Sequence, residues 1–219
     1  MRNILSLAFV CLAFITNAQY WQQSVHYNMD ITMDVANSQY TGQQQITYTN
    51  NSPDTLHKTY FHLYFNAFQP ESMMDVRSRT IYDPDRRVKD RIKSLGKDEI
   101  GYQNIQSLTQ NGQPLDWNIH GTVMKCILAE PLLPGQSTTF EMSWNAQVPQ
   151  QIRRSGRNNK EGIEFTMTQW YPKLAEYDQD GWHPDQYVGR EFYGVWGSFD
   201  VHVNIHRDYV LGGTGYLQN

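Results

Sequence analysis

The chain carries few charges and almost no cysteine. Asp, Glu, Lys and Arg together make up 18% of the 219 residues, and 18 basic against 22 acidic residues give a formal charge of −4 at pH 7. A protein that binds nucleic acid through a basic face needs a concentrated excess of Lys and Arg, so this composition argues against that class. With 39% hydrophobic and 13% aromatic residues, the chain is also unlike a disordered protein. We expect one globular unit with a substantial core.

Several motifs of catalytic sites are missing as well. The sequence has no His-Glu-x-x-His, no Cys-x-x-Cys, no Gly-x-Ser-x-Gly and no phosphate-binding Gly-x-x-x-x-Gly-Lys. The spacing that comes closest to a metal pair is His202 and His206, four residues apart. Because Phe199, Val201 and Val203 alternate with polar residues, the segment is predicted to be a strand. Residues four apart on a strand are roughly 13 Å from each other, too far to share one ion. No metal site is therefore expected in this chain.

The only long apolar run lies at the N-terminus. Arg2 precedes an apolar stretch over residues 4–15, and small or polar residues follow at 16–18. The run is shorter than the roughly 20 residues that span a membrane, so it predicts a signal peptide over residues 1–18 and export to the periplasm or the extracellular space. Cleavage before Gln19 would remove Cys11 and leave Cys126 without a partner for an internal disulfide.

Most of the remaining chain is predicted to form strands. Apolar residues occupy every second position over residues 25–35, 140–148 and 199–205, a period that is typical of strands with one exposed face. A further strand is expected over residues 59–65, and Asn111-Gly112 and Pro134-Gly135 predict tight turns. Gln110, beside the first of these turns, is expected to be replaceable without effect. The fold class is therefore all-β, with residues 19–219 as a single domain.

Residues 71–99 differ from this pattern. They contain eight of the 18 basic residues and seven acidic ones. Asp85 could cap a helix in which Val88, Ile92 and Leu95 form a narrow apolar stripe. We expect an amphipathic helix on the surface of the β-domain, and an irregular loop is the alternative.

Three further segments could bind a ligand. Glu176, Asp178 and Asp180 resemble the start of a calcium loop, but the closing Glu is missing and a solvated acidic loop is favoured. The basic cluster at residues 153–157 is either an exposed loop or a docking point for a carboxylate. Residues 170–199 hold nine of the chain's 29 aromatic residues, which either fill the core or line a binding surface.

The order of these segments resembles the N-terminal β-domain of the gluzincin zinc aminopeptidases, the family of aminopeptidase N and leukotriene hydrolase. The resemblance extends over nearly all of the chain after the predicted signal peptide. It rests on FHLYFN at 61–66, LLPG at 132–135, TQWYPK at 168–173, EFYG at 191–194, GSFDV at 197–201 and YVLGGTG at 209–215.

The resemblance implies a saddle-like or sandwich β-domain whose own catalytic, zinc-binding domain follows it. The zinc and the catalytic residues of the complete enzyme would belong to that following domain, so none is expected here. Gln169 would reach from the β-domain to the main chain of a peptide substrate, with Trp170 and Tyr171 beside it. Many members carry Glu two residues after that Gln, where this chain has Tyr171. The competing interpretation is a secreted, non-catalytic β-sandwich that binds peptide or glycan through its aromatic segment.

The predicted signal peptide can be tested on the exported protein. We expect its first residue to be Gln19, because the apolar run and the small residues at 16–18 together direct cleavage there. Intact mass or N-terminal sequencing measures this directly. Retention of residues 1–18 would contradict the prediction.

Overall fold

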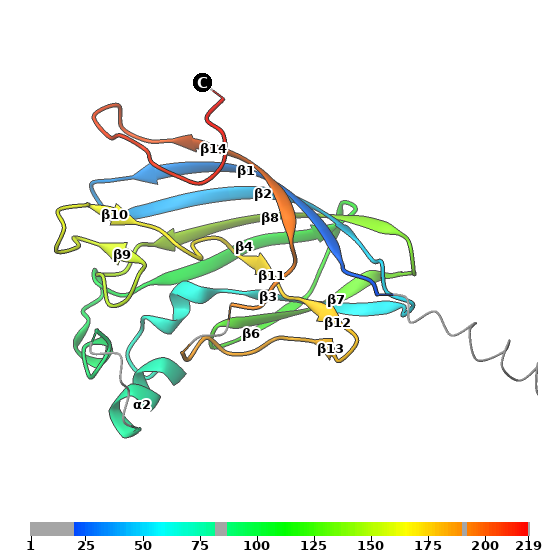
Figure 1. The fold of residues 1–219 in the computed structure, drawn as a ribbon, viewed down its shortest axis with the longest axis horizontal. Coiled ribbons are helices and arrows are strands. Elements are labelled where there is room, and N and C mark those ends of the chain that lie inside the picture. The colour runs from blue at the N-terminus through cyan, green and yellow to red at the C-terminus, as the bar shows by residue number, and fades with distance from the viewer. Residues whose placement is uncertain (1–19, 82–86, 190–191, 219) are drawn as a thin grey trace, which may run out of the picture.

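The computed structural model describes residues 20–81, 87–189 and 192–218, so the predicted signal peptide lies outside the described residues. The chain is rich in strands and has one short α-helix, which confirms the predicted all-β class (Figure 1). None of its helices in the described part is long and apolar enough to cross a membrane. The strands are β1 (Ser24–Asp34), β2 (Gln39–Thr49), β3 (Leu56–His62), β4 (Tyr102–Gln110), β5 (Gln113–Pro114), β6 (Trp117–His120), β7 (Val123–Leu132), β8 (Ser137–Gln147), β9 (Gly156–Arg157), β10 (Phe165–Thr166), β11 (Lys173–Leu174), β12 (Tyr177–Asp178), β13 (Gly181–Trp182) and β14 (Gly197–Asn204).

The larger sheet has the order β14-β1-β2-β8-β4-β5. Its pairs are antiparallel except for β1 and β14, which run parallel along one edge. The alternation in sequence becomes a strict alternation of burial, since the odd residues of β1 from Val25 to Ile31 are buried. The opposite face of the sheet therefore consists mainly of Thr, Ser, Asn and Gln side chains in water.

A second sheet covers the inner face of the larger one. Its order is β11-β3-β7-β6, and Figure 1 shows it below the larger sheet. The core between the two sheets is aromatic: Phe61 of β3 meets Phe140 of β8 edge to face, with ring centroids 5.9 Å apart. Cys126 of β7 is a free, buried cysteine in this layer.

Two sequence predictions are corrected here. The strand expected over residues 59–65 ends at His62, and a 3-10 turn, η1 (Tyr64–Ala67), follows. The helix expected after Asp85 is instead α2 (Met73–Thr80), where the side chain of Ser72 accepts a hydrogen bond from the N–H of Asp75. Asp85 lies outside the described residues. Val88 and Ile92 of the predicted apolar stripe are fully buried in the core. They lie in turns and in a short 3-10 turn, η2 (Ile92–Ser94), instead of in an α-helix.

Gln110, which was expected to be replaceable beside a turn, is buried and hydrogen-bonded in the structure. It is 2% exposed, its Nε2 donates to the carbonyl of Glu130 at 2.9 Å, and its Oε1 accepts from the N–H of Glu130 at 3.2 Å. The side chain therefore joins β4 to β7. An alanine at this position would remove both hydrogen bonds to the backbone of Glu130, so this contact argues against a silent substitution.

Gly42 makes room for the largest core side chain. It lies directly opposite Trp144 in the β2–β8 ladder, and a Cβ atom at residue 42 would come within 2.2 Å of the indole ring. We expect Gly42→Ala to lower the free energy of unfolding by about 1–3 kcal/mol, the usual cost of overpacking a core. Urea denaturation measures this. Gly96→Ala is the control, because its Cβ would meet only a side-chain oxygen at 3.6 Å; equal stabilities of the two variants would contradict the prediction.

Candidate functional site

Residues 168–174, here called the strap, lie against the inner face of the larger sheet. They contain Gln169, Trp170 and Tyr171, the three residues that the sequence singled out. Buried polar side chains from three strands of the sheet hold the strap by its main chain. The sequence favours this arrangement because Tyr27, Tyr40 and Gln44 stand at inward-facing positions of β1 and β2, where an apolar residue would be usual.

The carbonyl of Trp170 is the strongest attachment point. It accepts hydrogen bonds from the phenol of Tyr40 and from Nε2 of Gln103, the latter at 2.6 Å. Burial raises the pKa of Tyr40 well above its usual range, so the phenol stays protonated and remains a donor. Gln103 is itself completely buried. The peptide unit after Trp170 is therefore fixed from two strands, β2 and β4.

The next residues of the strap are held in the same way. Nε2 of Gln44 donates to the carbonyl of Pro172 at 3.0 Å, and the N–H of Leu174 donates to the phenol oxygen of Tyr27 at 3.0 Å. Leu174 then pairs with Phe61 as part of β11. The strap thus passes without a break from the larger sheet to the smaller one.

On the other side of Gln169, one hydroxyl group fixes Thr168. Oγ of Ser155 accepts from the N–H of Thr168 at 2.8 Å and donates to the carbonyl of the same residue at 2.8 Å. A hydroxyl can do both because it carries one donor and two acceptor sites. Ser155 is 5% exposed and belongs to the loop that carries the basic cluster. Gln169 therefore lies between two fixed residues.

Gln169 itself has a strained backbone and a free side chain. Its φ is +56°, in the left-handed region that residues other than Gly rarely occupy. The side chain is partly exposed, and within the described residues its amide makes no hydrogen bond. Strain of this kind persists where surrounding contacts enforce it, and it is common at binding and catalytic sites. The amide can both donate to and accept from the main chain of a bound peptide.

Trp170 and Tyr171 lie beside Gln169 but are packed into the protein. Tyr171 contacts the rings of Tyr27, Trp170 and Phe199 at centroid distances of 5.4, 5.3 and 5.9 Å. Burial raises the pKa of its phenol. Both side chains pack against the core with partial exposure and support the strap.

The aromatic segment is mainly part of the core. Tyr187 is buried, and Trp170, Tyr171, Tyr177, Trp182 and Phe192 pack against the core with partial exposure. Tyr193, Trp196 and Phe199 are the three that stand more than a third exposed. Most of these rings therefore contribute to the core, and Tyr193, Trp196 and Phe199 are the ones that a ligand could reach most easily.

The acidic residues 176–181 form a short hairpin, β12–β13, rather than a solvated loop. Oδ1 of Asp178 bonds to Nε2 of His183 at 2.7 Å, and its Oδ2 accepts from the phenol of Tyr193 at 2.9 Å. Glu176 is 7% exposed, and burial raises the pKa of its carboxyl. The carboxylate of Asp178 is thus used by His183 and Tyr193, and no group of acidic side chains among the described residues could hold a metal ion, so the resemblance to a calcium loop has no counterpart in the geometry.

No group of three or more His, Cys, Asp or Glu side chains within residues 20–81, 87–189 and 192–218 could hold a metal ion. His202 stands in β14, as the alternation predicted, and its Nδ1 lies 3.0 Å from Asp30 of the neighbouring strand. His206 lies beyond the end of β14 and faces Asp208.

The sequence did not single out the residues that hold Gln169 in place. Tyr40, Gln103 and Ser155 attach the residues on both sides of it, yet each lies far from it along the chain. One signal was available: Gln44 interrupts the apolar row of β2, and a buried amide in such a row needs a partner.

The conformation of Gln169 predicts an unusual order of stabilities. Glycine tolerates a positive φ without steric cost, whereas alanine does not. We expect the free energy of unfolding of Gln169→Gly to exceed that of Gln169→Ala by about 1 kcal/mol. Urea denaturation of both variants decides this. At an ordinary position alanine is the more stable of the two, so that order would contradict the left-handed conformation.

No protein-family model and no curated protein matches this sequence significantly. Solved structures do show similarity. The M1 zinc metallopeptidase from Deinococcus radiodurans is 14% identical with a TM-score of 0.45, and the match covers 83% of this chain and 32% of that one. A mutant of that enzyme bound to a Tyr-Ser-Ala substrate gives 15% identity and a TM-score of 0.45 over 83% and 32% of the two chains. A two-domain M1 zinc metallopeptidase mutant bound to L-tryptophan is 14% identical with a TM-score of 0.45, and the match covers 84% of this chain and 33% of that one. The chain spans about a third of the length of these structures.

Proposed function

We propose that this chain is the substrate-cleft domain of an exported zinc metallopeptidase that hydrolyses peptides near their N-terminus. The domain itself is not catalytic. It forms one wall of the cleft, and Gln169 binds the main chain of the peptide. The zinc and the groups that activate water would belong to a separate catalytic domain.

One observation carries this proposal: Gln169 is strained, held from both sides, and has a free amide. Its neighbours are attached by Ser155 on one side and by Tyr40 and Gln103 on the other. A strained backbone that buried groups enforce is common at binding sites. The resemblance in sequence gives this amide its role as a contact to the substrate backbone.

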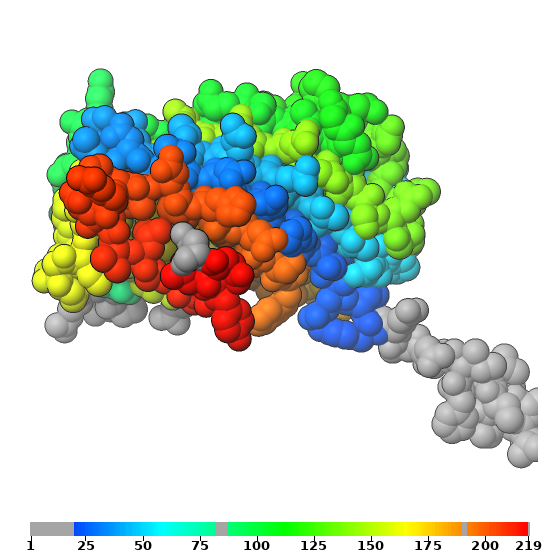
Figure 2. All heavy atoms as spheres, turned by 90° about the horizontal axis from the view of Figure 1, so that it is seen from above, coloured from blue at the N-terminus to red at the C-terminus, as the bar shows by residue number. Residues whose placement is uncertain are grey.

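Uncovered apolar surface supports a role beside another protein domain. Phe199, Val201 and Val203 of β14 are 40–43% exposed although they point to the same face as the buried residues of β1. The segment that follows exposes Val210 and Tyr216 almost completely. Figure 2 shows this orange and red part of the chain beside β1 on one face of the molecule. Apolar surface of this kind is typical of an interface.

The proposal can be tested by binding, because the domain should hold peptide without cleaving it. We expect Gln169→Ala to weaken the binding of Ala-Ala-Ala about 2- to 15-fold, the effect of one lost hydrogen bond. Titration followed by ¹H–¹⁵N NMR measures this at the millimolar affinity expected of one cleft wall. Gln43→Ala is the matched control, since Gln43 is exposed on the opposite face of the larger sheet.

Equal affinities of the wild type and Gln169→Ala would remove Gln169 from the site. Hydrolysis of an aminoacyl reporter by this chain, with one zinc bound per molecule, would contradict the assignment of catalysis to another domain. Binding of Ala-Ala-Ala that depends on Trp196 and not on Gln169 would favour a peptide-binding β-sandwich instead.

A further inference from the structure

Two of the three arginines in the basic cluster are used by the fold. Nη1 of Arg153 donates to the carbonyl of Gly189 at 2.6 Å. Arg157 donates to the carbonyl of Asp98 and, at 3.2 Å, to the hydroxyl of Ser38. Both guanidinium groups therefore fix neighbouring loops.

Arg154 is different. Its guanidinium lies over the ring of Phe192, 4.9 Å from the centroid, and its side chain is exposed. It makes no hydrogen bond and no ion pair with any residue that the structure describes. Stacking on an aromatic ring orients the plane of a guanidinium group and leaves the N–H groups at its edge available. Such a planar fork matches the two oxygens of a carboxylate.

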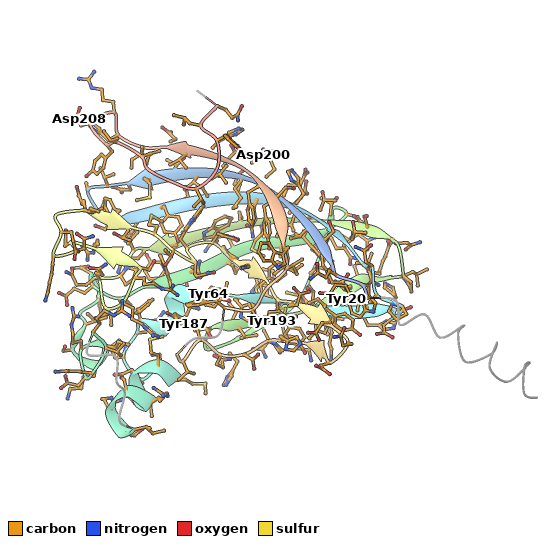
Figure 3. All side chains as sticks on the ribbon, in the orientation of Figure 1. Tyr20, Tyr64, Tyr187, Tyr193, Asp200 and Asp208 are labelled. Atoms are coloured by element: carbon orange, nitrogen blue, oxygen red, sulfur yellow. The ribbon has the colours of Figure 1, made fainter. Side chains whose placement is uncertain are left out.

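The ring beneath Arg154 is itself firmly held. Phe192 contacts Tyr187 at 4.9 Å and Tyr64 at 5.4 Å between centroids, and these two tyrosines lie next to each other in Figure 3. The position of Arg154 thus depends on buried aromatic packing rather than on a flexible loop alone.

Arg154 is also close to Gln169 through a short chain of contacts. It precedes Ser155, whose hydroxyl holds both main-chain groups of Thr168, the neighbour of Gln169. Residues 150–168 carry four basic and two acidic side chains, whereas the whole chain has a net negative charge. An amide and a guanidinium group that bond to none of the described residues therefore belong to two neighbouring segments, which the hydroxyl of Ser155 joins.

We propose that Arg154 binds a carboxylate of the peptide that Gln169 holds, and so favours short peptides with a nearby negative charge. The carboxylate is either the C-terminal group of the peptide or an Asp or Glu side chain. This inference rests on the proposed function, because it takes the peptide at Gln169 as its ligand.

The test is a ¹H–¹⁵N NMR titration of this chain with three peptides: Ala-Ala-Ala, its C-terminal amide, and the C-terminal amide of Ala-Glu-Ala. We expect at least one peptide with a carboxylate to bind about 3- to 10-fold more tightly than Ala-Ala-Ala amide, the range for one surface pair with two hydrogen bonds. The first and third peptides identify the source of the carboxylate. Arg154→Gln should abolish the preference, and Arg154→Lys should restore only part of it because lysine lacks the planar fork.

Lys125→Gln is the matched control, since it removes one exposed charge from β7. If neither peptide with a carboxylate binds more tightly than Ala-Ala-Ala amide, the inference is wrong. It is also wrong if the tighter binding persists in Arg154→Gln. If the preference depends on Arg154 while Gln169→Ala binds all three peptides like the wild type, the carboxylate site stands and the role of Gln169 fails. If Gln169→Ala weakens all three equally and Arg154→Gln changes nothing, the role of Gln169 stands and the carboxylate site fails.

Discussion

The carbonyl of Trp170 is the point on which the arrangement of the site depends. It is buried and accepts two hydrogen bonds, from Tyr40 of β2 and from Gln103 of β4. Gln103 also accepts from the N–H of Phe65 at 3.4 Å, and its own N–H donates to Asn66 at 2.8 Å. A buried carbonyl that lost both partners would cost about 1–3 kcal/mol. These bonds join the larger sheet, the turn after β3 and the strap, and they hold the residue next to Gln169 in place.

The strands could be predicted because their burial repeats every second residue. That period is visible in β1, β2 and β8, and the structure confirms it in each. In β14 the sequence alternates in the same way and the strand forms, but all of its residues are exposed. The strand prediction failed at residues 63–65, where an apolar run fits a buried strand and a buried 3-10 turn equally well. The role of Gln110 could not be predicted, because its hydrogen-bond partner Glu130 lies on another strand and a single sequence does not identify that partner.

The site was only partly accessible from sequence. Gln169 was found through a resemblance, and no local pattern marks a left-handed glutamine. The groups that enforce its backbone, Ser155, Tyr40 and Gln103, come together only after the sheets have formed. The basic cluster was visible as a run of charges, but only the structure separates Arg153 and Arg157, which bind main-chain carbonyls, from Arg154, which bonds to none of the residues that the structure describes. The net charge of the chain did not indicate this cluster, because the chain as a whole is negative while residues 150–168 carry four basic and two acidic side chains.

The most direct test of the account is to locate a bound peptide relative to Gln169. An isotope-filtered NOE experiment with methyl-labelled Ala-Ala-Ala would do this in solution. We expect intermolecular NOEs from the peptide to the side-chain amide protons of Gln169. NOEs to the exposed rings of Tyr193 and Trp196, with none to Gln169, would contradict this expectation and place the peptide at those two rings instead.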